Sequence, residues 1–87
     1  MAGKSEFQVR ILKENQVIYD GLCRVLFVPD TTGKEELAIL PFHTPLIGLV
    51  GAGMVRIGTG GKAKPVTEIK RGIVHCSNNE ATVLVNA

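Results

Sequence analysis

Four residues of this chain carry side chains suited to nucleophilic or metal chemistry, and all four are cysteines or histidines. They are Cys23, His43, His75 and Cys76. His75 and Cys76 are neighbours, and successive side chains of a strand point to opposite faces of the sheet, so these two could not share a proton as a catalytic pair does. No two of the four have the spacing of a local ligand pair for a tetrahedral ion. The sequence therefore predicts no catalytic residue and no metal site.

Two glycine-rich stretches resemble phosphate-binding loops, but neither has the complete motif. The stretch at 51–56 has Arg56 where a dinucleotide fingerprint needs its third glycine, and no helical pattern follows it. The pair Gly61-Lys62 would need a glycine at 56 and a hydroxyl residue at 63 to form a Walker loop, but the chain has Arg56 and Ala63 there. Hairpin turns account better for these glycines. We therefore expect no bound nucleotide and no other cofactor.

Composition limits the partners of the chain. Its 87 residues predict one domain over 1–87, and its net charge of +2 is too small to indicate nucleic-acid binding. The two cysteines form no closely spaced pair, so we expect free thiols packed as small hydrophobic side chains. The first residues contain no apolar signal segment. The most apolar run, at 46–55, is far shorter than the roughly 20 residues of a membrane helix, and we expect no membrane insertion.

Apolar periodicity predicts an all-β fold with short turns and no helix. Residues 6–12 alternate between apolar and polar side chains, which is typical of a half-buried strand. Further strands are expected at 17–19, 22–28, 36–40, 46–50, 54–57, 65–69, 72–76 and 81–85. The run at 22–28 is almost wholly apolar and indicates a strand buried on both faces, while Asp20-Gly21 before it could form a hairpin turn, a bulge or a sharp bend. Short strands at this spacing favour a sandwich or a small barrel.

A corner defined by Pro41 and Pro45 joins the strands expected at 36–40 and 46–50. Proline fixes its own φ and favours an extended conformation in the residue before it, so this corner should be stiff. It presents Phe42 and His43 at a fixed place, and such loops often carry function. His43 could either satisfy turn carbonyls or contact a partner. Phe42 could be an exposed contact or a lid on the sandwich, and we favour the lid.

The corner also carries a resemblance to a known family. Residues 36–46 read Glu-Leu-Ala-Ile-Leu-Pro-Phe-His-Thr-Pro-Leu, which resembles the G-E-L-G-I-L-P-G-H-A-P-L segment of the ε subunit of F-type ATP synthases. Residues 53–57 match the G-x-[IV]-R-[IV] strand of that family, and residues 81–85 match its N-x-V-T-V-L-A strand. The order holds from about residue 7 to residue 87.

The sequence departs from the family pattern at three glycine positions. Ala38 and Phe42 replace glycines, and Arg71 replaces the first glycine of a pair. Phe42 matters most, because a bulky residue at a turn glycine either changes the turn type or shows that a positive φ is not required there.

The resemblance implies a fold and two sets of contact residues. The expected fold is a sandwich of two five-stranded sheets, an ε-type domain that occupies the whole chain. The residues expected to touch the membrane-embedded ring of c subunits are Lys34, Glu35 and Glu36. Those expected to lie toward the γ subunit of the central stalk are Pro41, His43 and Leu46.

The resemblance also implies a role, namely a non-catalytic rotor subunit that links γ to the c-ring and so couples proton or sodium flow to ATP synthesis. Its expected location is peripheral, on the cytoplasmic face of a bacterial inner membrane or the equivalent face in an organelle. In the family a helical hairpin follows this domain, whereas the sequence here stops at Asn86-Ala87. We therefore expect the chain neither to bind ATP nor to inhibit hydrolysis. The alternative is a stand-alone β-sandwich adaptor that binds another protein.

Overall fold

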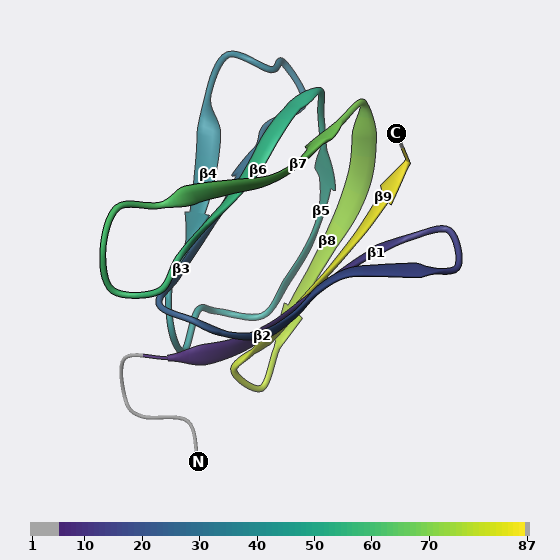
Figure 1. Ribbon diagram of the computed structural model, residues 1–87. Coiled ribbons are helices and arrows are strands. Elements are labelled where there is room, and N and C mark those ends of the chain that lie inside the picture. Colours follow the sequence, from purple (N-terminus) through teal and green to yellow (C-terminus); the bar gives the residue numbers. More distant parts are fainter. Residues whose placement is uncertain (1–5, 87) are drawn as a thin grey trace.

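The computed structural model describes residues 6–86, which form nine strands in two sheets packed face to face (Figure 1). The described residues contain no helix, and the predicted all-β sandwich is confirmed. The strands are β1 (Phe7–Lys13), β2 (Gln16–Cys23), β3 (Val25–Pro29), β4 (Glu36–Ile39), β5 (Leu46–Val50), β6 (Gly53–Gly58), β7 (Lys64–Ile69), β8 (Arg71–Ser77) and β9 (Glu80–Asn86).

The larger sheet has five strands in the order β2-β1-β9-β8-β5. All of its neighbouring pairs are antiparallel except β1 and β9, which pair in parallel over residues 8–13 and 80–85. A parallel pair cannot be joined by a short turn. Here the first and last strands of the chain form that pair, in the centre of the sheet.

The second sheet has four strands among the described residues, in the order β4-β3-β6-β7, and all its pairs are antiparallel. The expectation of five strands in this sheet was therefore wrong in number. The segment from 40 to 45 passes from β4 in one sheet to β5 in the other. Two of its residues are prolines, which have no N–H to donate to a ladder, and the segment adds no strand to either sheet.

The core lies between the sheets and is apolar. Phe7, Val9 and Ile11 of β1 point into it, as the alternation predicted, and alternate residues of β9 do the same. No polar or charged residue within 6–86 is buried. Because burying a polar group without a hydrogen-bond partner costs free energy, this core can stabilise the sandwich by hydrophobic burial alone.

The chain changes sheets at Arg24, which corrects two expectations from the sequence. Asp20 and Gly21 lie inside β2, paired with Arg10 and Val9, so they form neither a turn nor a bend. The register shifts instead between the pairs Ile11–Tyr19 and Leu12–Val17, which leaves Ile18 of β2 as the extra residue. The apolar run at 22–28 is not one strand, because β2 ends at Cys23 and β3 begins at Val25. The run is apolar because it contributes to the core from both sheets in turn.

The proline corner is fastened to the β8–β9 turn by Asn79. The Oδ1 atom of Asn79 accepts a hydrogen bond from the backbone N–H of Phe42 at 2.7 Å. Its Nδ2 atom donates to the carbonyl oxygen of Glu6 at 3.0 Å. Asn78 and Asn79 both have a positive φ, which suits a two-residue hairpin turn. One side chain thus joins three segments that are distant in the sequence.

Phe42 is not a lid. Its side chain is 66% exposed and its φ is +60°. The backbone N–H of His43 donates to the carbonyl oxygen of Leu40 at 3.1 Å, so Leu40 to His43 form a tight turn with Pro41 and Phe42 at its centre. A turn with proline at its second position and a positive φ at its third normally has glycine in that third position. The left-handed conformation is therefore kept at this position even though a phenylalanine occupies it.

Replacing Phe42 by glycine should stabilise the chain. A non-glycine residue in this conformation costs about 1–2 kcal/mol, and the extra freedom that glycine gives the unfolded chain offsets roughly 0.4–1 kcal/mol of the gain. We expect Phe42→Gly to raise the free energy of unfolding by about 0.5 kcal/mol, measured by urea denaturation. Phe42→Ala is the matched control, because it also removes the ring but keeps the Cβ atom. Equal stability of the two variants would contradict the strain argument.

Both cysteines are buried free thiols, as the sequence predicted. Burial raises the pKa of Cys23 from its ordinary value of 9.0 to about 12, and it also raises the pKa of Cys76. We expect thiol reagents to label both residues in denaturant and neither in the native chain at pH 8. Because the unfolded chain loses these protons first, the free energy of unfolding should fall as the pH rises from 9 toward 12. Rapid native labelling at pH 8 would contradict the burial.

Candidate subunit interface

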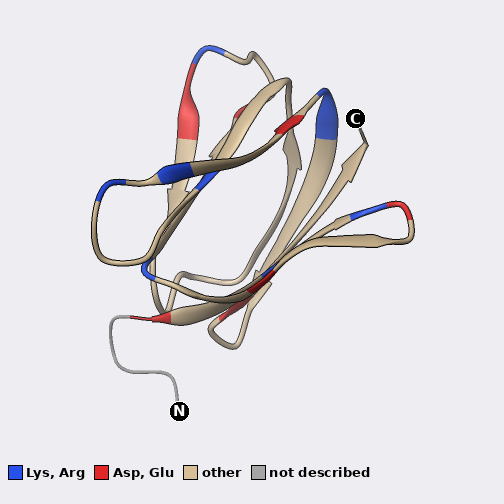
Figure 2. Ribbon diagram, in the orientation of Figure 1, with Lys and Arg blue, Asp and Glu red and all other residues tan. Residues whose placement is uncertain are grey.

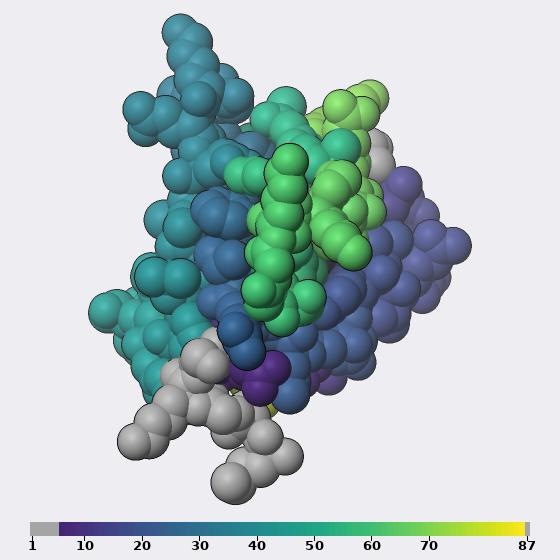
Figure 3. Space-filling model, turned by 60° about the vertical axis from the view of Figure 1, so that its left-hand side comes forward, coloured from purple at the N-terminus to yellow at the C-terminus, as the bar shows by residue number. Residues whose placement is uncertain are grey.

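The polar loop between β3 and β4 projects from one end of the sandwich (Figure 3). The carboxylate of Asp30 organises it, because its Oδ1 atom accepts hydrogen bonds from the Thr32 hydroxyl at 2.7 Å, the Thr32 N–H at 3.1 Å and the Glu35 N–H at 3.4 Å. These bonds, the Thr32 hydroxyl first, lower the pKa of Asp30. Lys34 and Glu35 are exposed on the loop, so a charged tip is held on an ordered base (Figure 2).

Glu36 differs from its two neighbours because it is paired within the chain. The Nη2 atom of Arg56 lies 2.6 Å from Oε1 of Glu36, and the Nε atom lies 3.1 Å from Oε2. The guanidinium also lies over the ring of Phe27, 4.6 Å from its centroid. A two-bond pair of this kind fixes the geometry of both side chains. Glu36 is therefore part of the outer face of the four-stranded sheet, and the free charges of the loop are those of Lys34 and Glu35.

The three residues expected to face γ lie together at the opposite end of β4, but they do not share one surface. Pro41 and His43 are half-buried, and Nδ1 of His43 lies 2.7 Å from the carbonyl oxygen of Thr44. Leu46 packs against the core. On β5, which follows the corner, the side chains of Ile47 and Leu49 are 76% and 71% open to solvent on the outer face of the sheet.

An apolar row crosses the outer face of the five-stranded sheet, and the sequence analysis missed it. Strand pairing places Leu49 beside Ile73, Ile73 beside Leu84, Leu84 beside Leu12, and Leu12 beside Val17. The row therefore has one aliphatic side chain on each of the five strands. A signal was present in the sequence, because these strands contain consecutive apolar residues where a half-exposed strand would alternate with polar ones.

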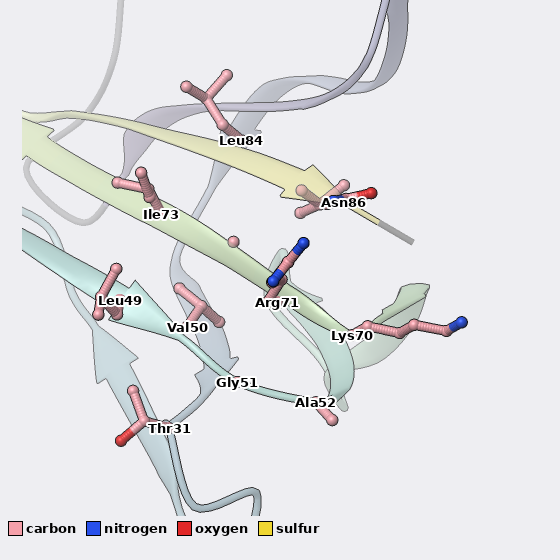
Figure 4. A pocket seen from close by; sticks show the side chains of 12 residues that line it. Thr31, Leu49, Val50, Gly51, Ala52, Lys70, Arg71, Ile73, Leu84 and Asn86 are labelled. Atoms are coloured by element: carbon pink, nitrogen blue, oxygen red, sulfur yellow. The ribbon is translucent and has the colours of Figure 1, made fainter.

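A groove of about 650 Å³ lies on the β5, β8 and β9 side of this row (Figure 4). Its aliphatic walls include Leu49, Ile73 and Leu84, and the basic side chains of Lys70 and Arg71 lie at one end. No carboxylate within residues 6–86 lies in salt-bridge distance of either base. An apolar surface with unpaired charge at one end is suited to binding a protein surface, because apolar area supplies affinity and charge supplies orientation.

The histidines and cysteines do not form one site. His75 is exposed and Cys76 is buried, so they point to opposite faces of β8 as predicted. Within 6–86, no three histidine, cysteine, aspartate or glutamate side chains come close enough together to hold a metal ion. The same residues contain no helix long and apolar enough to cross a membrane.

Comparison with known proteins gives one consistent result. A sequence model described as the β-sandwich domain of the ATP synthase delta/epsilon chain matches residues 6–87. The ATP synthase epsilon chain of Synechococcus elongatus is 34% identical over 79 residues, which cover 91% of this chain and 56% of that protein. The epsilon chain of a Cyanothece species is 33% identical over 79 residues, covering 91% and 55%. The chain therefore spans about half the length of these relatives.

Two solved structures share the fold at low sequence identity. A chain in the mitochondrial ATP synthase of Euglena gracilis, in a structure of OSCP, F1 and c-ring, superposes with a TM-score of 0.81 at 14% identity, covering 93% of this chain and 51% of that one. A chain in the central stalk and c-ring of Tetrahymena thermophila mitochondrial ATP synthase gives 0.69 at 14% identity, covering 92% and 63%. Sequence and fold agree over the whole described sandwich, and the chain belongs to the ATP synthase delta/epsilon chain family, whose β-sandwich domain it forms.

Proposed function

We propose that this chain is a non-catalytic rotor subunit of an F-type ATP synthase, which links the γ subunit of the central stalk to the c-ring and so couples ion flow to ATP synthesis. The observation that carries the proposal is the family match over residues 6–87. The Tetrahymena chain with the same fold was solved in the central stalk and c-ring of a mitochondrial ATP synthase. The proposed location is peripheral, on the membrane face that carries the catalytic head.

The proposed γ surface consists of the proline corner and the outer face of β5. It differs from the surface expected from sequence, because Leu46 packs inward and Ile47 and Leu49 take its place. Large aliphatic side chains that are open to water gain most by burial against a partner, and a few such residues usually carry most of the affinity. Asn79 holds the corner at a fixed position next to them, which lowers the entropic cost of docking.

The proposed c-ring surface is the charged tip of the β3–β4 loop, with Lys34 and Glu35 as its free charges. The loop lies at the end of β4 opposite the corner, so the loop tip and the corner lie at opposite ends of that strand (Figure 1). Glu36 supports this surface indirectly, because its pair with Arg56 fixes the first residue of β4. Polar loops suit a contact that must orient two subunits, since charge contributes more to specificity than to affinity.

Reconstitution tests the proposed function. We expect this chain, added to an ATP synthase depleted of its epsilon chain, to restore proton-driven ATP synthesis and to leave the rate of ATP hydrolysis unchanged. Titration calorimetry with Mg-ATP should show no binding, because the two glycine-rich stretches lie in turns and strands and residues 6–86 contain no helix N-terminus that could hold a phosphate. Loss of hydrolysis in proportion to added chain would contradict this role, and a failure to bind γ would favour the adaptor alternative.

A charged residue at position 47 should weaken γ binding. We expect Ile47→Asp to lower the affinity for isolated γ by about 5- to 30-fold, since the change places a charge in an apolar contact worth about 1–2 kcal/mol. Met54→Asp is the control, because Met54 is partly exposed on β6 of the other sheet. Both variants should keep the circular dichroism spectrum of the parent chain. Equal loss of γ binding in the two variants would remove β5 from the proposed surface.

Replacing Glu35 and replacing Glu36 should have different effects on stability. Glu35→Lys should weaken c-ring binding with no change in stability, and Glu36→Lys should also lower the free energy of unfolding by about 0.5–1 kcal/mol through loss of the Arg56 pair. Both binding effects should shrink as salt is raised, because exposed charges are screened. Binding of each variant to isolated c-ring is measured by capture at 20 and 300 mM salt, and the stability of each variant is measured by urea denaturation. Unchanged capture with Glu35→Lys at low salt would show that the loop tip does not face the ring.

A further inference from the structure

Four strands lie at sheet edges in the described chain, and β5 alone carries neither a charge nor a proline. The edge strands are β2 and β5 in one sheet and β4 and β7 in the other. β2 contains Asp20, β4 begins with Glu36, and β7 contains Pro65 between charged residues. Charges and prolines on edges prevent strands of other molecules from pairing there. β5 reads Leu-Ile-Gly-Leu-Val and has no such protection.

The exposed side of β5 is suited to receive another strand. β5 pairs only with β8, so its other side presents a row of backbone N–H and C=O groups that have no ladder partner within 6–86. Ile47 and Leu49 are also the two most exposed large hydrophobic residues of the described chain. A strand added here would satisfy the backbone groups and cover both side chains, two gains that normally occur together in strand addition.

We propose that the free chain pairs with a second copy of itself through β5, antiparallel and centred on Gly48. In this register Ile47 lies opposite Leu49 of the second copy, and Leu46 lies opposite Val50 of the second copy. The sequence of β5 is symmetric in character about its glycine, with one aliphatic pair on the outer face and one facing the core. Every contact is repeated by the two-fold axis, so the interface closes as a dimer and leaves no further β5 edge open.

The symmetry of β5 favours a second copy over a foreign strand. No charged residue of β5 opposes another across the two-fold axis, since the strand has none. Glycine at the centre also keeps side chains away from the point where the two strands lie closest. A partner strand from another protein would need its own apolar alternation and register, whereas a second copy supplies both from the same five residues. The pairing joins two five-stranded sheets into one continuous sheet.

Pairing through β5 concerns the free chain before assembly and does not depend on the proposed function. One consequence does rest on the proposed function. Ile47 and Leu49 also belong to the proposed γ surface, so a chain paired through β5 could not bind γ through those residues. Dimerisation and γ binding would then compete. In the unassembled subunit the second copy would cover the β5 edge until γ takes its place.

Sedimentation equilibrium of the chain alone is the first test. We expect a concentration-dependent mass that approaches twice the 9.3 kDa of one chain. Ile47→Lys should weaken self-association by at least about tenfold, because a lysine on an edge strand opposes pairing. Val17→Lys is the control, since Val17 is 61% exposed on β2, the opposite edge of the same sheet. A monomer at every concentration, or a dimer lost equally in both variants, would overturn the proposal.

Cysteine cross-linking tests the register. Residues directly opposite in an antiparallel pair have Cα atoms about 4.5–5.5 Å apart, within the range of about 4.4–6.8 Å that a disulfide spans. A Cβ atom at Gly48 would lie 3.3 Å from Cδ1 of Leu46, so Gly48→Cys needs only a small side-chain shift. We expect Gly48→Cys to form a disulfide-linked dimer on mild oxidation much faster than the exposed control Val17→Cys. Equal rates would show that the copies do not meet at Gly48, whatever their mass in solution.

Discussion

The parallel pairing of β1 with β9 is the interaction on which the rest of the sandwich depends. Without it the larger sheet would separate into a β1–β2 hairpin and a three-stranded β9–β8–β5 unit, because the β1–β9 pairing is what joins them. The pairing connects residues 8–13 to residues 80–85, so the sheet is complete only when the last strand of the described chain is in place. Contacts between such distant segments cost loop entropy before they contribute stability. We therefore expect cooperative and comparatively slow folding.

A sandwich of this size has one apolar core between its two sheets, and the outer faces of the two sheets can differ in polarity. The four-stranded sheet carries the Glu36–Arg56 pair with Phe27 on its outer face, which is a polar and internally satisfied surface. The five-stranded sheet instead carries an aliphatic row that ends at Leu49 on an unprotected edge. Contiguous exposed apolar area on a small protein marks an interaction site. The asymmetry between the faces is thus the strongest structural argument that this protein works in contact with others.

The strands and the proline corner could be predicted from sequence because their causes are local. The alternation of apolar and polar residues predicted β1, and the spacing of Pro41 and Pro45 predicted the corner. The remaining features depend on pairing between distant segments. The apolar run at 22–28 serves both sheets, which no local pattern distinguishes from a strand buried on both faces. The partner of Glu36 lies twenty residues away. Leu46 packs against the core because of the point at which its strand enters the sheet. For that reason the proposed γ contact involves Ile47 and not Leu46.

The corner shows how such a domain can keep a strained conformation. Phe42 holds a positive φ that glycine would adopt at lower cost, and its ring is mostly exposed, so burial of that ring does little to offset the strain. The surrounding bonds hold the turn instead: His43 closes it through Leu40, and Asn79 anchors its centre to the β8–β9 turn. Backbone strain persists where neighbouring contacts over-determine a conformation, and such places cluster at functional sites. If the chain is the rotor subunit proposed above, a corner held by these two hydrogen bonds and carrying an exposed aromatic ring is suited to a docking point. A docking role explains the phenylalanine better than the turn does, because a glycine would form the same turn at lower cost but would offer a partner no side chain.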